Sequence, residues 1–95
     1  MMYDHGIQER FEKFHSENPE VYRLLVKFAR EAKAAGRKHY GMKSLFERLR
    51  WHVDIELKGE HEFKLNNNYT SRYARRIRDL EFDLRDFFET RELKA

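Results

Sequence analysis

The residues whose types and spacing most clearly suggest chemistry lie between Asn66 and Arg78. Three asparagines are followed by hydroxyl side chains and then by arginines, where a loop is expected to enter a helix. The first turn of a helix presents free amides and a positive dipole end, and both attract phosphate. Arginine can bind phosphate or guanine, and asparagine can pair with adenine. The segment predicts contact with nucleic acid, and the alternative is that these residues only cap and solubilise a surface helix.

A helix over this segment places an arginine face beside an apolar stripe. The arginine face carries Arg72, Arg75 and Arg76. These side chains can bind a polyanion only if they stay exposed and unpaired, because binding replaces their counterions. The hypothesis fails if carboxylates of the same chain hold them. The complete set of predicted nucleic-acid-binding residues is Lys43, Arg48, Lys58, Lys64, Asn67, Asn68, Thr70, Ser71, Arg72, Arg75 and Arg76.

The charge of the chain is unevenly distributed. The 95 residues carry a formal net charge of +3. Residues 36–78 hold 11 Lys and Arg against 5 Asp and Glu, whereas residues 79–95 hold 3 against 6. A basic middle segment favours a polyanionic partner such as duplex DNA, and the acidic end is expected to cover part of the basic surface.

Composition argues against several classes of protein. There is no cysteine, which excludes a disulfide framework and fits a reducing cytoplasm. No apolar run approaches the length of a membrane span, so we expect a soluble cytoplasmic protein without membrane contact. The sequence shows no phosphate-binding glycine loop, activated nucleophile or pocket motif for a small-molecule substrate. We therefore predict a protein that is not an enzyme and has no cofactor.

Two weaker constellations have simpler explanations. The acid-x-Lys order of Glu56 and Lys58, after Asp54, occurs in metal-dependent nucleases, but chance alternation on an exposed strand explains it better. Five histidines suggest a metal site, yet only His52 and His61 could meet across a hairpin, and two ligands make a poor zinc site. No metal site is predicted.

Hydrophobic periodicity predicts a mainly α-helical protein with a short β-hairpin. Helices are expected over 7–17, 19–35 and 42–51, the second one bounded by Asn18 and Pro19 at its start and Gly36 at its end. Apolar and acidic residues alternate from Val53 to Leu57, and polar and apolar residues alternate again from His61 to Leu65, which favours two strands joined by a turn. The competing interpretation extends the third helix through Leu57.

These elements predict a winged-helix-like single domain over residues 1–95. It consists of an N-terminal helix (1–17), a core with helices and hairpin (18–80) and an acidic C-terminal helix (81–95). The order departs from the usual one, because the hairpin precedes the arginine helix instead of following it. That departure weakens the assignment of the arginines to a DNA groove.

Two blocks carry a family resemblance: Leu45 to Val53, and the FKLNNNYTSRYAR block from Phe63 to Arg75. They resemble a family of small uncharacterised proteins encoded by phages and bacterial prophages. The similarity covers about Asn18 to Leu93, and the second block is the more specific. The resemblance implies a bacterial or phage cytoplasmic setting and brings no site residues with it.

A second hypothesis is a protein-interaction module. Aromatic residues make up 15% of the chain, and the basic middle and acidic end could form complementary contacts. Such a module would bind a host protein or form a homodimer.

Overall fold

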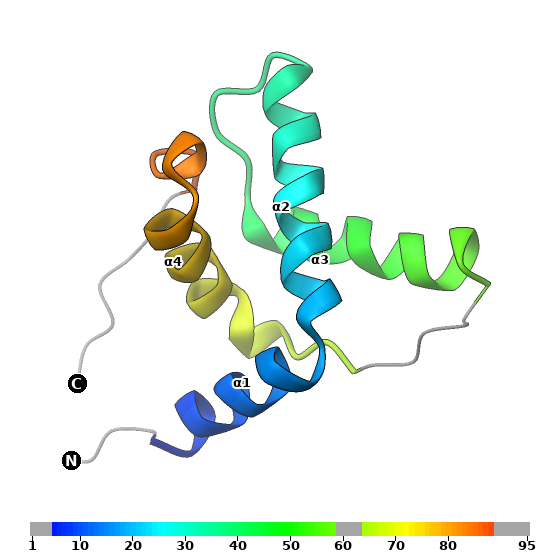
Figure 1. Cartoon of the computed structure of the whole chain (residues 1–95). Coiled ribbons are helices and arrows are strands. Elements are labelled where there is room, and N and C mark those ends of the chain that lie inside the picture. Colours follow the sequence, from blue (N-terminus) through cyan, green and yellow to red (C-terminus); the bar gives the residue numbers. More distant parts are fainter. Residues whose placement is uncertain (1–4, 59–63, 89–95) are drawn as a thin grey trace.

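Four α-helices and three shorter helical turns form the described part of the chain, which is residues 5–58 and 64–88 of the computed structural model (Figure 1). The α-helices are α1 (His5–Glu17), α2 (Pro19–Ala34), α3 (Met42–Trp51) and α4 (Thr70–Leu80). A π-helical turn, His52–Glu56, continues α3, and 3₁₀ turns cover Asn67–Tyr69 and Phe82–Leu84. Helix α2 packs against α1, α3 and α4, so it is the central element.

One cluster of buried side chains joins all four helices. Its largest fully buried members are Tyr73, Phe11, Phe46, Leu25, Leu45, Leu49, Ile77, Leu84 and Val21. Burying an aromatic or large aliphatic side chain contributes roughly 1.5–3 kcal/mol each. Because Phe11 belongs to this cluster, α1 is part of the core and not a detachable arm.

The boundaries of α2 follow local signals in the sequence. Pro19 occupies the first turn, where a missing N–H costs nothing. Gly36 has a φ of 102°, a left-handed conformation that suits glycine after a helix end. Asn18 does not cap α2 with its side chain as expected. Its Nδ2 instead donates to the carbonyl oxygen of Phe14 at 3.0 Å and closes the end of α1.

The predicted β-hairpin is wrong, because the described residues contain no strand. Where Val53 to Leu57 was expected to form the first strand, the chain continues α3 as the π-helical turn. The helical turn allows contacts that a strand could not make, since Glu56 Oε1 lies 2.8 Å from His52 Nδ1 and 2.9 Å from Arg48 Nη1. These hydrogen bonds, from His52 first and Arg48 second, lower the pKa of the Glu56 carboxyl.

A winged helix needs a hairpin as its wing, so the winged-helix-like interpretation is wrong as well. The competing interpretation, a longer third helix, agrees with the structure. Of the second expected strand, residues 61–63 lie outside the described residues, and Lys64 and Leu65 have no regular structure.

The C-terminal segment 81–95 is described only as far as Phe88. Within that range the expected acidic helix is represented by the 3₁₀ turn Phe82–Leu84 and a further turn. Leu84, Phe87 and Phe88 are buried in the common core, so the segment packs against the helices. No helix among the described residues combines the length and apolarity needed to cross a membrane.

Candidate functional site

The asparagine block serves mainly to build the start of α4. Asn66 Oδ1 accepts a hydrogen bond from the Asn68 amide at 2.8 Å, which caps the 3₁₀ turn. Asn67 Oδ1 accepts from Arg50 Nη2 at 2.7 Å, and the same nitrogen donates to the Leu65 carbonyl at 2.8 Å. Arg50 therefore fastens the loop to α3, and the side chain of Asn67, one of the two predicted asparagines, is taken up by this internal contact.

Two of the three predicted arginines contact α1. Arg72 Nε donates to Gln8 Oε1 at 2.8 Å, across 64 positions of sequence. Arg76 Nη2 donates to Glu12 Oε2, and its guanidinium lies 5.2 Å from the centre of the Phe11 ring. Since Arg76 is held by a carboxylate of its own chain, it does not meet the condition set for binding a polyanion.

Arg75 differs from Arg72 and Arg76. Its Nε and Nη2 are buried and have no hydrogen-bond partner within the described part of the chain. Arg75 as a whole is half-buried, so the shielding applies to these two nitrogens and not to the whole side chain. These two nitrogens are shielded from solvent, and an external phosphate could not reach them without a rearrangement.

The interface between α1 and α4 is aromatic and contains a histidine. Phe11 meets Tyr73 edge to face at 4.9 Å, and His15 stacks on Phe11 at 6.0 Å. Burial, and then the positive charge of Arg76, lower the pKa of His15. Arg72 and Arg76 thus close the edge of a structural interface, which we call the α1–α4 interface.

The acidic end of the described chain pairs with other cations than the predicted ones. Asp83 accepts two hydrogen bonds from Arg30, both at 3.0 Å, and Glu81 accepts a third at 2.8 Å. The bonds from Arg30 lower the pKa of Asp83. Asp79 pairs with the adjacent Arg78. The C-terminal carboxylates therefore tie the chain end to α2 and leave the arginine face of α4 to α1.

The remaining predicted cations lie in different surroundings. Arg48 pairs with Glu56 and lies 4.2 Å from the centre of the Phe28 ring, so it is a structural residue. Lys58, at a positive φ of 53°, and Lys64 are exposed at the edges of the undescribed segment 59–63. Of the predicted set, Lys43, Thr70 and Ser71 line one cleft together.

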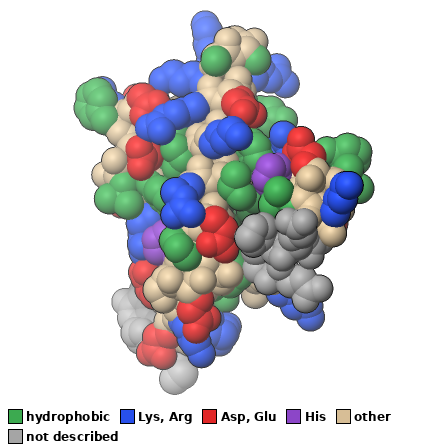
Figure 2. Space-filling model, turned by 45° about the vertical axis from the view of Figure 1, so that its right-hand side comes forward, with side chains coloured by type: hydrophobic (Ala, Val, Ile, Leu, Met, Phe, Trp, Pro, Cys, Tyr) green, Lys and Arg blue, Asp and Glu red, His purple; other side chains and the backbone are tan. Residues whose placement is uncertain are grey.

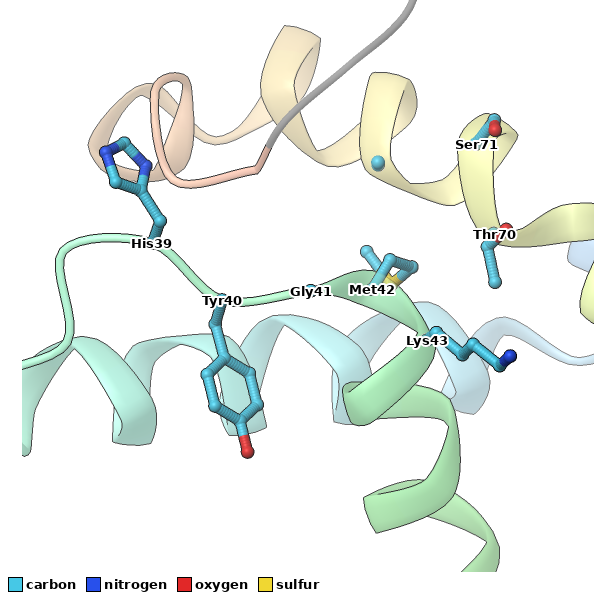
Figure 3. A pocket seen from close by; sticks show the side chains of 8 residues that line it. His39, Tyr40, Gly41, Met42, Lys43, Thr70 and Ser71 are labelled. Carbon is cyan, nitrogen blue, oxygen red and sulfur yellow. The ribbon is translucent and has the colours of Figure 1, made fainter.

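This first cleft lies where α3 and α4 both begin (Figure 3). Its volume is about 370 Å³. In Figure 3, Lys43 extends toward the start of α4, His39 points toward the C-terminal turn, and the Tyr40 ring turns away toward α2. The lining residues are His39, Tyr40, Gly41, Met42, Lys43, Thr70, Ser71 and Ala74. Gly41, the residue before α3, provides no side-chain cap for the first amides of the helix.

A second cleft, of about 640 Å³, adjoins the first. It lies between the connection from α2 to α3 and the turn that follows α4, and His39 lines both clefts. Lys33, Arg37 and Lys38 line one side, and Phe82 and Arg85 line the other.

The connection between α2 and α3 carries three exposed cations, Arg37, Lys38 and Lys43, which we call the cationic connection. None of the three has an ion pair with a described residue, whereas six arginines elsewhere in the described chain do. Figure 2 agrees with this contrast: blue side chains surround the upper end of the molecule, where α2 ends, while blue and red are mixed lower down. Nothing in the sequence marks Arg37 and Lys38 as binding residues. Their positive charges are explained by their place near the C-terminal end of a helix.

The described residues contain no group of three or more potential metal ligands. In comparisons with known proteins, no family model matches the chain, no curated protein is similar to it, and no solved structure matches its fold. The resemblance to phage and prophage proteins accordingly stays a prediction.

Proposed function

We propose that this protein binds nucleic acid, and that it does so through the cationic connection and the first cleft. The observation that carries the proposal is a row of cations without ion pairs to described residues along the connection: Lys43 lines the first cleft, where two helices begin, and Arg37 and Lys38 line the second cleft. A phosphate in the first cleft meets the positive charge of Lys43 and the starts of two helices, and further phosphates of the same strand meet Arg37 and Lys38. The hydroxyl groups of Thr70 and Ser71 line the same cleft and can donate hydrogen bonds to phosphate oxygens.

The proposal does not depend on the arginine face of α4. Arg72 and Arg76 are engaged by α1, and α1 cannot leave without exposing Phe11, which is only 1% exposed. The cationic connection is expected to contact phosphate, and phosphate contacts fix position but carry no sequence information. We therefore expect binding with little base preference and with strong dependence on salt.

The test is binding of labelled oligonucleotides over a salt series, between about 50 and 200 mM. Three proteins are compared: wild type, Arg37→Gln/Lys38→Gln/Lys43→Gln, and the charge-matched control Arg10→Gln/Lys13→Gln/Arg23→Gln. The control removes three exposed cations of α1 and α2 that also lack ion pairs with described residues. Both triple variants should keep their stability to within about 0.5 kcal/mol, because all six positions are exposed.

For wild type, the logarithm of affinity should fall steeply with the logarithm of salt concentration. The first triple variant should reduce that slope by about one for each phosphate that the protein no longer neutralises, and the control should change it much less. If the two triple variants bind with equal affinities and equal salt slopes, the cationic connection is not the binding surface. Absence of salt-dependent binding by wild type would end the proposal.

Two exposed apolar residues near the junction of α3 and the π-helical turn favour a second candidate function, which is the binding of another protein. Trp51 is 57% exposed and Ile55 is 53% exposed, and both lie where α3 runs into its continuation. Tryptophan is enriched among the residues that dominate protein interfaces. Light scattering of wild type and Trp51→Ala would test for a homodimer. If wild type is a dimer and Trp51→Ala is a monomer, this function is favoured. If wild type is a monomer at all concentrations tested, the homodimer hypothesis is rejected.

A further inference from the structure

Phe82 is the most exposed large apolar residue of the described chain, at 75%. A single exposed phenylalanine needs no explanation, so its surroundings decide whether it has a role. It lines the second cleft together with four cations, Lys33, Arg37, Lys38 and Arg85. The guanidinium carbon of Arg85 lies 4.2 Å from the centre of the Phe82 ring, which is a cation–π contact.

The charges around the ring favour an anionic ligand. Two carboxylates, Asp83 and Asp86, line the same cleft as the four cations. Asp83 is already neutralised by Arg30, which lies outside the cleft lining, and Arg85 is 3.6 Å from Asp86. Arg37 and Lys38 remain without an ion pair in the described residues. An exposed aromatic ring beside unpaired cations has the two elements that single-stranded nucleic acid requires, a stacking surface and phosphate contacts.

We infer that the second cleft binds an unpaired nucleobase, stacked on Phe82, while the cationic connection holds the phosphates on either side of it. The inference rests on the proposed function and makes it narrower, since the preferred ligand becomes single-stranded nucleic acid. A duplex keeps its bases stacked on one another and offers only their edges, so it cannot use the Phe82 ring. Arg85 covers one face of the ring and adds positive charge next to the stacked base.

The chain offers a direct spectroscopic test, because it has one tryptophan. Trp51→Phe/Phe82→Trp moves the only indole into the second cleft, and both positions are exposed enough to accept the change. Stacking of a base on the indole should quench its fluorescence. The probes are a short oligothymidylate, its ribose counterpart oligouridylate, an abasic oligonucleotide of equal length and a hairpin duplex.

Quenching by the single strands, and none by the abasic strand at saturation, is the expected result. Equal quenching by deoxyribose and ribose strands indicates recognition of bases without regard to sugar, and unequal quenching identifies the preferred nucleic acid. In the wild-type background, Phe82→Ala should lower affinity for the single strand by roughly 5- to 150-fold, Phe82→Tyr should retain it, and neither should alter duplex affinity.

Failure of this inference is distinguishable from failure of the proposed function. If Phe82→Ala binds the single strand as well as wild type does, while the triple variant of the cationic connection binds it poorly, the stacking site is disproved and the phosphate surface stands. Quenching by the abasic strand equal to that by oligothymidylate would also disprove stacking. If wild type binds none of the probes, both proposals fall.

Discussion

The α1–α4 interface and the cationic connection both carry positive side chains, but their neighbours give those side chains opposite roles. At the α1–α4 interface, Arg72 and Arg76 meet an amide and a carboxylate beside a buried phenylalanine. At the cationic connection, Arg37 and Lys38 form no ion pair with the described residues. The first region uses its charge for internal contacts, and the second has its charge available to a ligand.

The comparison shows that the number of arginines in a segment is a poor guide to binding. Segment 72–78 is the densest in arginine, and the structure uses it to attach α1. Ion pairing within the chain supplies the counter-charge that a polyanion would otherwise supply. Three experiments can break or sharpen this distinction.

The largest effect is expected from Phe11→Ala. Removing a fully buried ring leaves a cavity between α1 and α4 and should lower the free energy of unfolding by about 3–5 kcal/mol. Chemical denaturation measures the change. A decrease below about 1 kcal/mol would mean that α1 is a loosely attached cover, and the arginines beneath it would become candidates for ligand binding again.

A smaller effect is expected from the Arg76–Glu12 pair. A double-mutant cycle with Arg76→Gln and Glu12→Gln should give a coupling energy of about 0.5–1 kcal/mol, because both side chains are partly exposed and solvent screens the pair. Oligonucleotide affinity should be the same for Arg76→Gln and wild type. A fall in affinity equal to that caused by the triple variant would contradict the division between the two regions.

The smallest effect is a pH dependence that arises from His15. Its pKa in the folded protein is lower than the ordinary value of 6.5, so the unfolded chain binds the proton more readily. Stability is therefore complete above pH 6.5 and should decrease as the pH falls below that value toward the folded pKa. Thermal unfolding of wild type and His15→Gln at several pH values measures this pH dependence. On acidification, wild type should lose more stability than His15→Gln does. Parallel curves would show that His15 is not the group responsible.

Much of the helical framework was predictable because its signals are local. The apolar spacing of α2, Pro19 at its start and Gly36 after its end are all readable within one segment, and the structure confirms them. Residues 53–57 misled because apolar and acidic residues alternate there, yet Ile55 is exposed and only Val53 is buried. The helical conformation buries Val53 and allows Glu56 to bond to His52 and Arg48 on the preceding turns.

The candidate site was predicted only in part. Lys43, Thr70 and Ser71 were singled out by type, and the structure brings them to one cleft. The engagement of Arg72 and Arg76 could not be foreseen, because helical periodicity identifies a face but not the element that covers it. Their partners lie 64 positions earlier in the chain, in a helix whose polar residues carry no distinctive spacing.

The amide of Tyr40 donates to the carbonyl oxygen of Phe87 at 3.3 Å, and this bond ties the middle of the cationic connection to the turn after α4. Phe87 is itself buried in the common core. In the proposed binding mode, this bond joins the segment that contacts phosphate to the turn that carries Phe82. A strand would then be recognised best when the spacing between its stacked base and its phosphates matches the spacing of these two segments.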